Sequence, residues 1–355
     1  MALQAAGDAD LVALTLKDLG RGKWTDNSSA YRNTIALKKI INKRKTSMDS
    51  GYEVQWNRMV NTSNSARGVG FGAQDVVDIT NNMGTPPSIP WRHVTWNWAW
   101  DFREPLMNNS PAKIVDLIKT RRIAAMGSAI EYFEYRLWRA AATGSTDVDP
   151  YGIPNYLVKS ATAATVANNN GFNGLAPAGD TTVAGINPTT DTRWRNYTDA
   201  YTVVSKDDLI RKWRRMAEYT NFKPLVDNTP TYETGEETEF YTNYAVSGTL
   251  IEILESQNEN LGVDVAPYEG KAMFNRSKVN VVPELDNDTT NPVYQVPWSV
   301  MGCIGLTGAW MKETAIANVP GQHTLSATHT DVTLNIIMRD RRMGGVISNG
   351  TSMPA

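Results

Sequence analysis

The chain has 355 residues, of which 41% are hydrophobic and 20% are charged. This composition suits two or three packed cores and excludes a disordered chain. A formal net charge of −2 gives no electrostatic reason to bind nucleic acid tightly. The sequence has no run of 18 apolar residues for a membrane span and no signal peptide at its start. Its single cysteine, Cys303, excludes an intrachain disulfide and is predicted to be a small buried side chain.

Residues 1–48 are predicted to form an N-terminal arm. Residues 8–19 have the pattern of a short amphipathic helix. The lysine-rich stretch 35–46 permits two interpretations. Its basic side chains contact nucleic acid or an acidic partner, or they form the solvated face of a short helix that turns its isoleucines inward.

Residues 49–104 are predicted to form an extended β-hairpin loop, because short alternating apolar runs are separated by glycine and asparagine turns. In its last strand, Trp96, Trp98 and Trp100 fall two residues apart, so one face is almost wholly aromatic. So much apolar surface must pack on the body of the chain or be covered by a neighbouring subunit, since an uncovered patch would cause aggregation. A sugar-binding platform is the alternative function of this face.

Residues 68–73 match the loose G-x-G-x-x-A dinucleotide-binding pattern, but no helix opens after them, so we interpret the glycines as a bulge or a close strand approach. The sequence has no P-loop, no G-x-S-x-G and no H-E-x-x-H motif. Its three histidines, His93, His323 and His329, lack a favourable spacing for a metal. No catalytic residue, cofactor or metal ligand is therefore predicted, and the chain is not expected to be an enzyme.

The most strongly patterned stretch is 110–143, which is predicted to form one helix about 50 Å long. Ser110 suits the N-cap, Pro111 the first helical position and Gly144 the residue after the end. A helix of this length needs other elements to lie across. Its inner face is predicted to contain Ile114, Leu117, Ile118, Ala125, Met126, Ala129, Ile130, Phe133, Leu137, Ala140 and Ala141.

Residues 152–158 are predicted to return as a short strand, and a long loop rich in glycine and asparagine follows, with Trp194 anchoring its end. Ser205 is the predicted N-cap of the next helix. The inner stripe of that helix is Leu209, Trp213, Met216, Ala217 and Thr220. Arg214 and Arg215 fall outside the stripe, either as a solvated face or as a contact with another subunit or nucleic acid.

From about residue 231 to residue 322, strand patterns and one amphipathic helix predict a second compact α/β or α+β domain. Residues 323–355 are strand-like and end in two strands joined by an RDRR turn. The inward residues of the first of these strands are predicted to be Val332, Leu334, Ile336 and Met338.

An arm, an extended hairpin loop, one very long helix, a compact inserted domain and a final strand pair thus follow one another along the chain. Local signatures accompany them: GIPNYLV at 152–158, RWRNYT at the end of the glycine-rich loop and IIMRDRRMGGVI at 336–347. In this order and these signatures, the chain resembles the major capsid proteins of tailed double-stranded DNA bacteriophages, whose fold is shared with the capsid floor of herpesviruses. The resemblance covers nearly the whole chain.

The resemblance implies an α+β phage major capsid fold built from five segments. They are an N-terminal arm (1–48), an extended loop that lies over the next subunit (49–104), a peripheral domain with the spine helix 110–143 (105–230), an inserted axial domain that meets its copies at the capsomer centre (231–322), and C-terminal strands that return to the peripheral domain (323–355).

It also implies a structural protein that self-assembles into hexamers and pentamers of an icosahedral shell around packaged double-stranded DNA. Another virion component, a tail or vertex protein, is the alternative. The expected location is the virion capsid, after assembly in the host cytoplasm. The predicted subunit-interface residues are Trp56, Phe71, Trp91, Trp96, Trp98, Trp100, Trp194, Arg214 and Arg215.

The partners expected from the resemblance are copies of the chain itself, the portal, a separate scaffolding or decoration protein, and packaged DNA. The contact with DNA is expected to be weak and non-specific, on the inner wall, and no membrane is expected. Because no long charged leader precedes the arm, scaffolding is expected from a separate protein or not at all.

Overall fold

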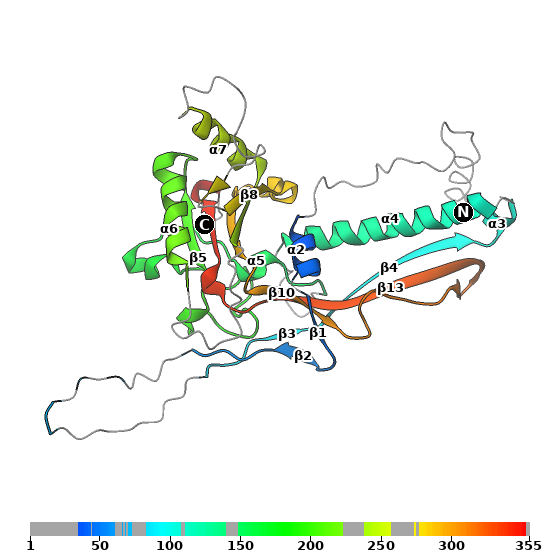
Figure 1. Ribbon diagram of the computed structural model, residues 1–355, viewed down its shortest axis with the longest axis horizontal. Helices are drawn as coiled ribbons and strands as arrows, with labels where there is room; N and C mark the ends of the chain where they lie inside the picture. The colour runs from blue at the N-terminus through cyan, green and yellow to red at the C-terminus, as the bar shows by residue number, and fades with distance from the viewer. Residues whose placement is uncertain are drawn as a thin grey trace.

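The computed structural model describes residues 35–43, 45–60, 66, 68, 70–72, 83–107, 111–139, 148–222, 238–256, 273–274 and 277–352. In these residues, two mixed sheets share one main hydrophobic core, and two arms project from it (Figure 1). The predicted helix at 8–19 and the predicted caps Ser110 and Gly144 lie outside the described residues.

The first sheet is built around β13 (Gln322–Met338), a strand of 17 residues. Along much of its length it pairs antiparallel with β4 (Arg92–Asp101). The other strands of this sheet are β1 (Lys45–Met48), β10 (Met301–Leu306), β11 (Lys312–Glu313) and β12 (Ala317–Val319). The end of β13 enters the core, and the structure confirms the predicted inward residues, which are all buried: Val332, Leu334, Ile336 and Met338.

The long helix is α4 (Pro111–Leu137), which runs beside β4 and β13 (Figure 1). We call α4, β4 and the paired part of β13 the wing. The helix ends short of the predicted residue 143, because Trp138 leaves the helical path and buries its indole with its centroid 5.0 Å from that of the Tyr241 ring. Gly152 then returns so close to the last turn of α4 that a Cβ there would lie 2.5 Å from the Arg136 carbonyl oxygen.

The buried stripe of α4 is narrower than predicted. Ala129, Phe133 and Leu137 are spaced four apart and are buried, as predicted. Ile130 is 40% exposed, so its predicted place on the inner face is wrong. Each helical residue turns the side chain by about 100°, and Ile130 therefore points away from the contact that Ala129 makes. The predicted members before residue 119 lie outside the described side chains.

Residues 152–158 contain a short helix, α5 (Ile153–Tyr156), in place of the predicted strand. Pro154 suits a first helical turn, and the Asn155 side chain accepts a hydrogen bond from the Gly152 N–H at 2.9 Å. The glycine-rich loop (159–196) follows. It contains two short helical turns, η1 (Val166–Gly171) and η2 (Thr192–Trp194).

The second sheet has the strand order β5-β14-β9-β6-β8-β7. Its strands are β5 (Tyr197–Tyr201), β6 (Thr238–Thr242), β7 (Met273–Phe274), β8 (Ser277–Val281), β9 (Val293–Pro297) and β14 (Gly345–Asn349). The strand pairing divides the chain differently from the predicted segments. Because β14 pairs with β5 and β9, part of the C-terminal segment lies in the second sheet, whereas β10 of the predicted axial segment lies in the first.

Helices and helical turns surround both sheets. Those not yet given are α2 (Ile35–Lys43), α3 (Arg103–Met107), η3 (Lys206–Ile210), α6 (Arg211–Tyr219), α7 (Tyr244–Ser256), η4 (Pro283–Asn287), η5 (Arg341–Met343) and η6 (Gly350–Ser352). In Figure 1, α6 and α7 lie beside the second sheet, and α3 lies at the far end of the wing.

The second arm leaves the core on the side opposite the wing (Figure 1). Its base is an antiparallel ribbon of β2 (Glu53–Gln55) and β3 (Ser88–Pro90). An isolated bridge between Met59 and Met83 extends the ribbon outward. The wing and this ribbon therefore carry the chain away from its core in two directions.

Candidate assembly surfaces

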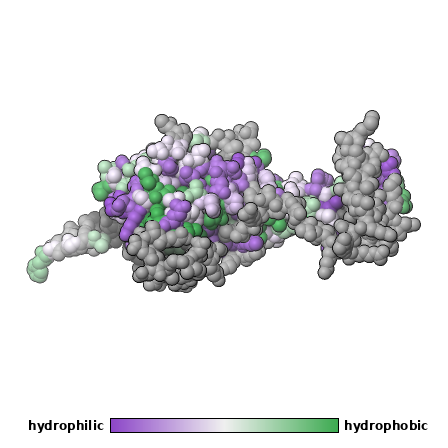
Figure 2. All heavy atoms as spheres, turned by 90° about the horizontal axis from the view of Figure 1, so that it is seen from above, coloured by the Kyte–Doolittle hydropathy of each residue, from purple (hydrophilic) through white to green (hydrophobic). Residues whose placement is uncertain are grey.

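The extended loop carries a fully exposed aromatic side chain. Phe71 is 112% exposed and lies at a turn with Gly72, whose φ of +77° is left-handed backbone that suits glycine. Tyr52, Met59 and Met83 are exposed as well. The far end of this arm is hydrophobic in Figure 2. A two-stranded projection has no core of its own, so its apolar side chains can be covered only from outside the loop.

The root of the extended loop is bound to the glycine-rich loop. Arg58 forms an ion pair with Asp191 and lies over the Trp194 ring, 5.1 Å from its centroid. Arg193 donates a hydrogen bond to the Val60 carbonyl oxygen. The direction in which the extended loop leaves the core is thus fixed by the chain itself. Sequence reasoning missed Arg58, because its partner lies 133 residues later in the chain.

Two predicted interface residues, Trp56 and Trp91, lie in this root. Both are partly buried and pack against the main core. The Trp91 Nε1 also donates to the Gly51 carbonyl oxygen at 2.8 Å, and the backbone N–H of Trp56 donates to the Pro87 carbonyl oxygen at 3.3 Å. These tryptophans hold the ribbon on the body, and only their outer surfaces are left for a neighbour.

The three tryptophans of β4 share one face of the strand, and each is partly buried. Trp96 meets Phe133 of α4 edge-on, with 6.4 Å between ring centroids, and joins the main core. Trp98 and Trp100 stack on each other at 5.0 Å, farther along the wing. The long helix therefore covers part of the aromatic face, which was one of the two predicted solutions.

Trp194 is 2% exposed, so its predicted place at a subunit interface is wrong. Its indole donates to the Val183 carbonyl oxygen at 3.0 Å. Its own carbonyl oxygen accepts a hydrogen bond from Arg341 at 2.6 Å. The glycine-rich loop has few apolar side chains, and it uses this tryptophan to build an interior.

Arg341 is the polar centre of that interior and is fully buried. Its Nε donates to the Tyr156 carbonyl oxygen at 2.7 Å. Its Nη2 donates to the Leu175 carbonyl oxygen at 2.8 Å and to Asn196 Oδ1 at 3.0 Å. Burial lowers the pKa of Arg341 to about 9, which still leaves it charged at neutral pH. Sequence reasoning found the RDRR turn (339–342), but only the tertiary structure shows which of its arginines is buried.

Arg214 and Arg215 lie on α6, which follows the π-helical turn η3. Ser205 Oγ accepts the Asp208 N–H at 3.2 Å, which confirms the predicted N-cap. The predicted inner residues Leu209, Trp213, Met216 and Thr220 are buried. Arg214 is exposed, whereas Arg215 donates to the Ala164 carbonyl oxygen and lies 5.2 Å from the centroid of the Tyr219 ring. Arg215 is thus engaged within the chain, and Arg214 faces solvent.

A groove of about 620 Å³ lies between the end of α4, α5 and η4. Its two carboxylates are paired with cations: Glu284 lies 3.8 Å from Arg139, and Asp288 forms an ion pair with Lys159. Burial raises the pKa of Asp288, but hydrogen bonds from Lys159 and Thr290 outweigh this effect and lower it below its ordinary value. The lowered pKa favours the ionised form of Asp288, which suits its ion pair with Lys159.

The part of the chain that the structure describes contains no cluster of three side chains suited to a metal ion. In the same residues, no helix combines the length and the apolar character that crossing a membrane requires.

No protein-family model and no curated protein matches the sequence. The fold, in contrast, matches solved capsid structures over nearly the whole chain. The capsid asymmetric unit of cyanophage A-1(L) gives a TM-score of 0.58 at 13% identity and covers 93% of this chain and 95% of that chain. The capsid of a native GTA particle gives a TM-score of 0.58 at 10% identity and covers 94% of this chain and 95% of that chain. The capsid of Myoviridae phage XM1 gives a TM-score of 0.50 at 12% identity and covers 94% of this chain and 99% of that chain. The predicted α+β phage capsid fold is thus confirmed.

Proposed function

We propose that the chain is the structural major capsid protein of a tailed double-stranded DNA phage. In this proposal it self-assembles into hexamers and pentamers, which close into an icosahedral shell around packaged DNA. The observation that carries the proposal is the match in fold to capsid chains over 93% to 95% of both partners. Because one fold can serve several functions, the shape and surface of the chain have to support the proposal independently.

The shape supports an assembled role. The wing and the extended loop project in opposite directions from one core (Figure 1), so neighbouring copies in a flat layer would overlap. The extended loop presents Phe71 and other apolar side chains to solvent, and such surface needs a partner. The net charge of −2 suits a wall that encloses a genome without gripping it.

We keep the five predicted segments as the proposed division, with two changes. The strands β5 and β14 join the second sheet, which we assign to the axial domain, and β10 joins the first sheet, which we assign to the peripheral domain. The proposed interface comprises Phe71, Trp98, Trp100 and Arg214, together with the outer surfaces of Trp56 and Trp91. Trp96 contributes little to it, because it packs on Phe133 within the chain.

The proposal extends to partners and location. The shell would include a portal, and a separate scaffolding or decoration protein would assist its assembly in the host cytoplasm. Contact with packaged DNA would be weak and non-specific, since exposed cations such as Arg214 are balanced by acidic groups elsewhere on the chain. The proposed role requires neither catalysis nor a membrane.

Negative-stain electron microscopy of the purified chain, with its sedimentation profile, tests the proposal. We expect closed shells, or rings of five and six subunits, over a range of protein concentrations. If the chain alone stays monomeric, the same measurement is repeated after co-expression with the structural genes that neighbour its own. A compact small oligomer without rings under both conditions would contradict the proposal.

A further inference from the structure

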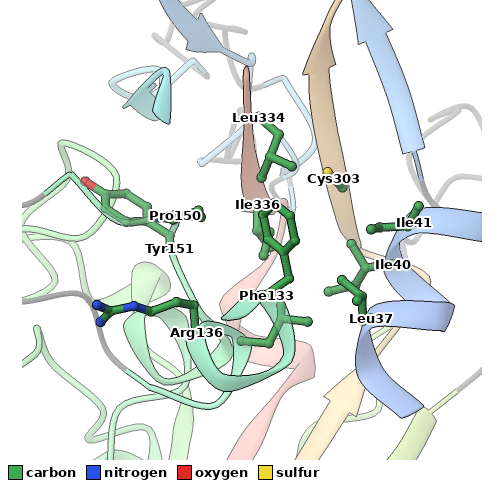
Figure 3. Close-up of a pocket in the computed structure, with 11 residues that line it drawn as sticks. Leu37, Ile40, Ile41, Phe133, Arg136, Pro150, Tyr151, Cys303, Leu334 and Ile336 are labelled. Atoms are coloured by element: carbon green, nitrogen blue, oxygen red, sulfur yellow. The ribbon is translucent and has the colours of Figure 1, made fainter. Parts of the chain in front are cut away.

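Helix α2 lies where the wing meets the core, and it falls in the lysine-rich stretch. Ile40 is buried and Lys38 is exposed, as the short-helix interpretation predicted, and Leu37 is buried as well. Lys39, in contrast, is mostly buried and does not lie on a solvated face. Figure 3 shows apolar side chains from α2, α4, β10 and β13 pointing toward one another: Leu37, Ile40, Ile41, Phe133, Cys303, Leu334 and Ile336. The space left among them is about 20 Å³, which is room for one water. Helix α2 is thus closely seated on the inner end of the wing.

One polar anchor ties α2 to the wing. Glu134 of α4 is 2% exposed, and its Oε2 accepts the Leu37 N–H at 3.0 Å. Its other oxygen accepts the Trp138 Nε1–H at 3.0 Å. The first N–H groups of a helix have no partner within the helix and carry partial positive charge. A buried carboxylate from α4 therefore caps α2, which has no acidic residue in its own first turn.

A second polar anchor ties the same helix to the second sheet. Lys39 Nζ lies 2.6 Å from Glu239 Oε1 on β6, and both side chains are mostly buried. The other Glu239 oxygen accepts the Tyr241 hydroxyl at 2.6 Å. The Trp298 Nε1 donates to that hydroxyl oxygen at 3.0 Å. The ion pair is therefore held in place by a network that belongs to the second sheet.

We propose that α2 is a strap that fixes the angle between the wing and the second sheet. Its Leu37 end is bound through Glu134 to the wing, and Lys39 is bound through Glu239 to β6. The two bodies also share the main hydrophobic core, and Trp138 touches Tyr241 between them. The ion pair of Lys39 with Glu239 adds a charge-assisted hydrogen bond, whose directionality restricts how α2 lies between the two bodies. In a shell, and this step rests on the proposed function, that angle would set the curvature of the layer and hence the particle diameter.

A double-mutant cycle on the full chain tests the attachment. The variants are Lys39→Met, Glu239→Gln and their combination, with Lys38→Met as the matched control. Hydrogen exchange of the α2 amides should become about tenfold faster in Lys39→Met, and the double variant should be no faster than the single variants. Lys38→Met should exchange like the unmodified chain. Additive effects in the cycle, or equal exchange in Lys39→Met and Lys38→Met, would overturn the proposal.

Energy transfer between dyes measures the angle directly. One dye at Ala317→Cys lies on β12, which pairs with the wing strand β13, and the other at Lys206→Cys lies beside α6. They report on the two bodies, and native Cys303 is buried and protected from labelling. The distribution of transfer efficiencies should broaden in Lys39→Met and stay narrow in Lys38→Met. Faster exchange in α2 without broadening would overturn the strap, because α2 would then be attached without fixing the angle.

Electron microscopy of the same variants separates this inference from the proposed function. Lys39→Met should give shells of mixed diameter where the unmodified chain gives one size. Shells of one size from every variant would overturn the control of curvature while leaving the proposed function intact. If the unmodified chain forms neither shells nor rings, alone or after co-expression, the proposed function fails, and exchange and energy transfer still decide whether α2 is a strap.

Discussion

The glycine-rich loop and the extended loop are alike in sequence, since both are long, polar and interrupted by glycines, yet their aromatic side chains end in opposite surroundings. Trp194 is buried among carbonyl groups that Arg341 binds. Phe71 remains exposed on the other loop. A loop without a core of its own is therefore stabilised by whatever lies within reach. For one loop this is an arginine of the same chain, and for the other, in the proposed shell, it is a neighbouring copy.

Arg341→Met removes the arginine that stabilises the glycine-rich loop and should have the largest effect on stability. The substitution leaves the buried carbonyl oxygens of Tyr156, Trp194 and Leu175 without their donor. We expect the free energy of unfolding to fall by about 3–5 kcal/mol, measured by urea unfolding with tryptophan fluorescence. Arg341→Lys is the control, which keeps the charge without the planar fork and should recover only part of the loss. A loss below about 1 kcal/mol would show that the loop does not depend on Arg341.

Phe71→Ser tests whether a neighbouring copy covers the exposed aromatic side chain of the extended loop. Because the side chain is fully exposed, the free energy of unfolding of the subunit should change by less than about 0.5 kcal/mol. Assembly should nevertheless be lost or strongly reduced, since aromatic anchors carry much of the binding energy at interfaces. Val166→Ser changes another exposed apolar side chain, on the glycine-rich loop; it is the matched control and should assemble normally. Sedimentation velocity measures the assembly of both variants. Normal shells from Phe71→Ser would mean that no neighbour covers this side chain.

The elements that could be predicted from the sequence are those with a strong local period. The alternation in β4 was read in the right register, and the helix of α4 was found, because side-chain periodicity is a property of neighbouring residues. In β13, all residues from Val332 to Met338 are buried, so burial does not distinguish the two faces of that strand. The end of α4 and the helix α5 were missed. Both depend on contacts between distant segments, such as Trp138 with Tyr241 and Gly152 with the last turn of α4, and these override local preference.

The candidate surfaces were harder to predict, because exposure is not a property of residue type. Trp194 and Phe71 are both aromatic residues in polar loops of the sequence, and contacts with residues such as Arg341 and Val183 bury only Trp194. Trp96 and Trp98 likewise share one strand face, yet only Trp96 reaches Phe133. Arg58 carried no signal at all, since its role depends on Asp191 in another loop.

The wing offers a third case, intermediate between the two loops. Ile130 is partly exposed and Ala129 is buried, although they are adjacent on α4. Ile130→Asp should therefore lower the free energy of unfolding by only about 0.5 kcal/mol. Ala129→Asp is the matched variant and should cost several times more, because it places an unpaired charge in the core. Thermal unfolding followed by circular dichroism compares them, and equal losses would mean that the orientation of α4 about its axis is wrong.

The smallest effect should come from Asp288, which pairs with Lys159 at the start of the glycine-rich loop. Despite its burial, hydrogen bonds from Lys159 and Thr290 hold the pKa of Asp288 below its ordinary value of 3.8. A carboxyl group whose pKa is lower in the folded chain stabilises the fold above about pH 4, and this contribution is lost as the pH falls through the folded-state value. Asp288→Asn should thus slightly lower stability at neutral pH and make the acid loss of stability less steep.

Asp207 supplies the control for that experiment, because its ion pair with Arg211 is exposed on both sides. Asp207→Asn should change the free energy of unfolding by less than about 0.5 kcal/mol, because an exposed ion pair contributes little to stability. If Asp288→Asn gave the same pH dependence as Asp207→Asn, the ion pair with Lys159 would not hold the start of the loop. The position of the glycine-rich loop would then depend on Arg341 and Trp194 at its other end, and the loss expected from Arg341→Met would move toward the upper end of its range.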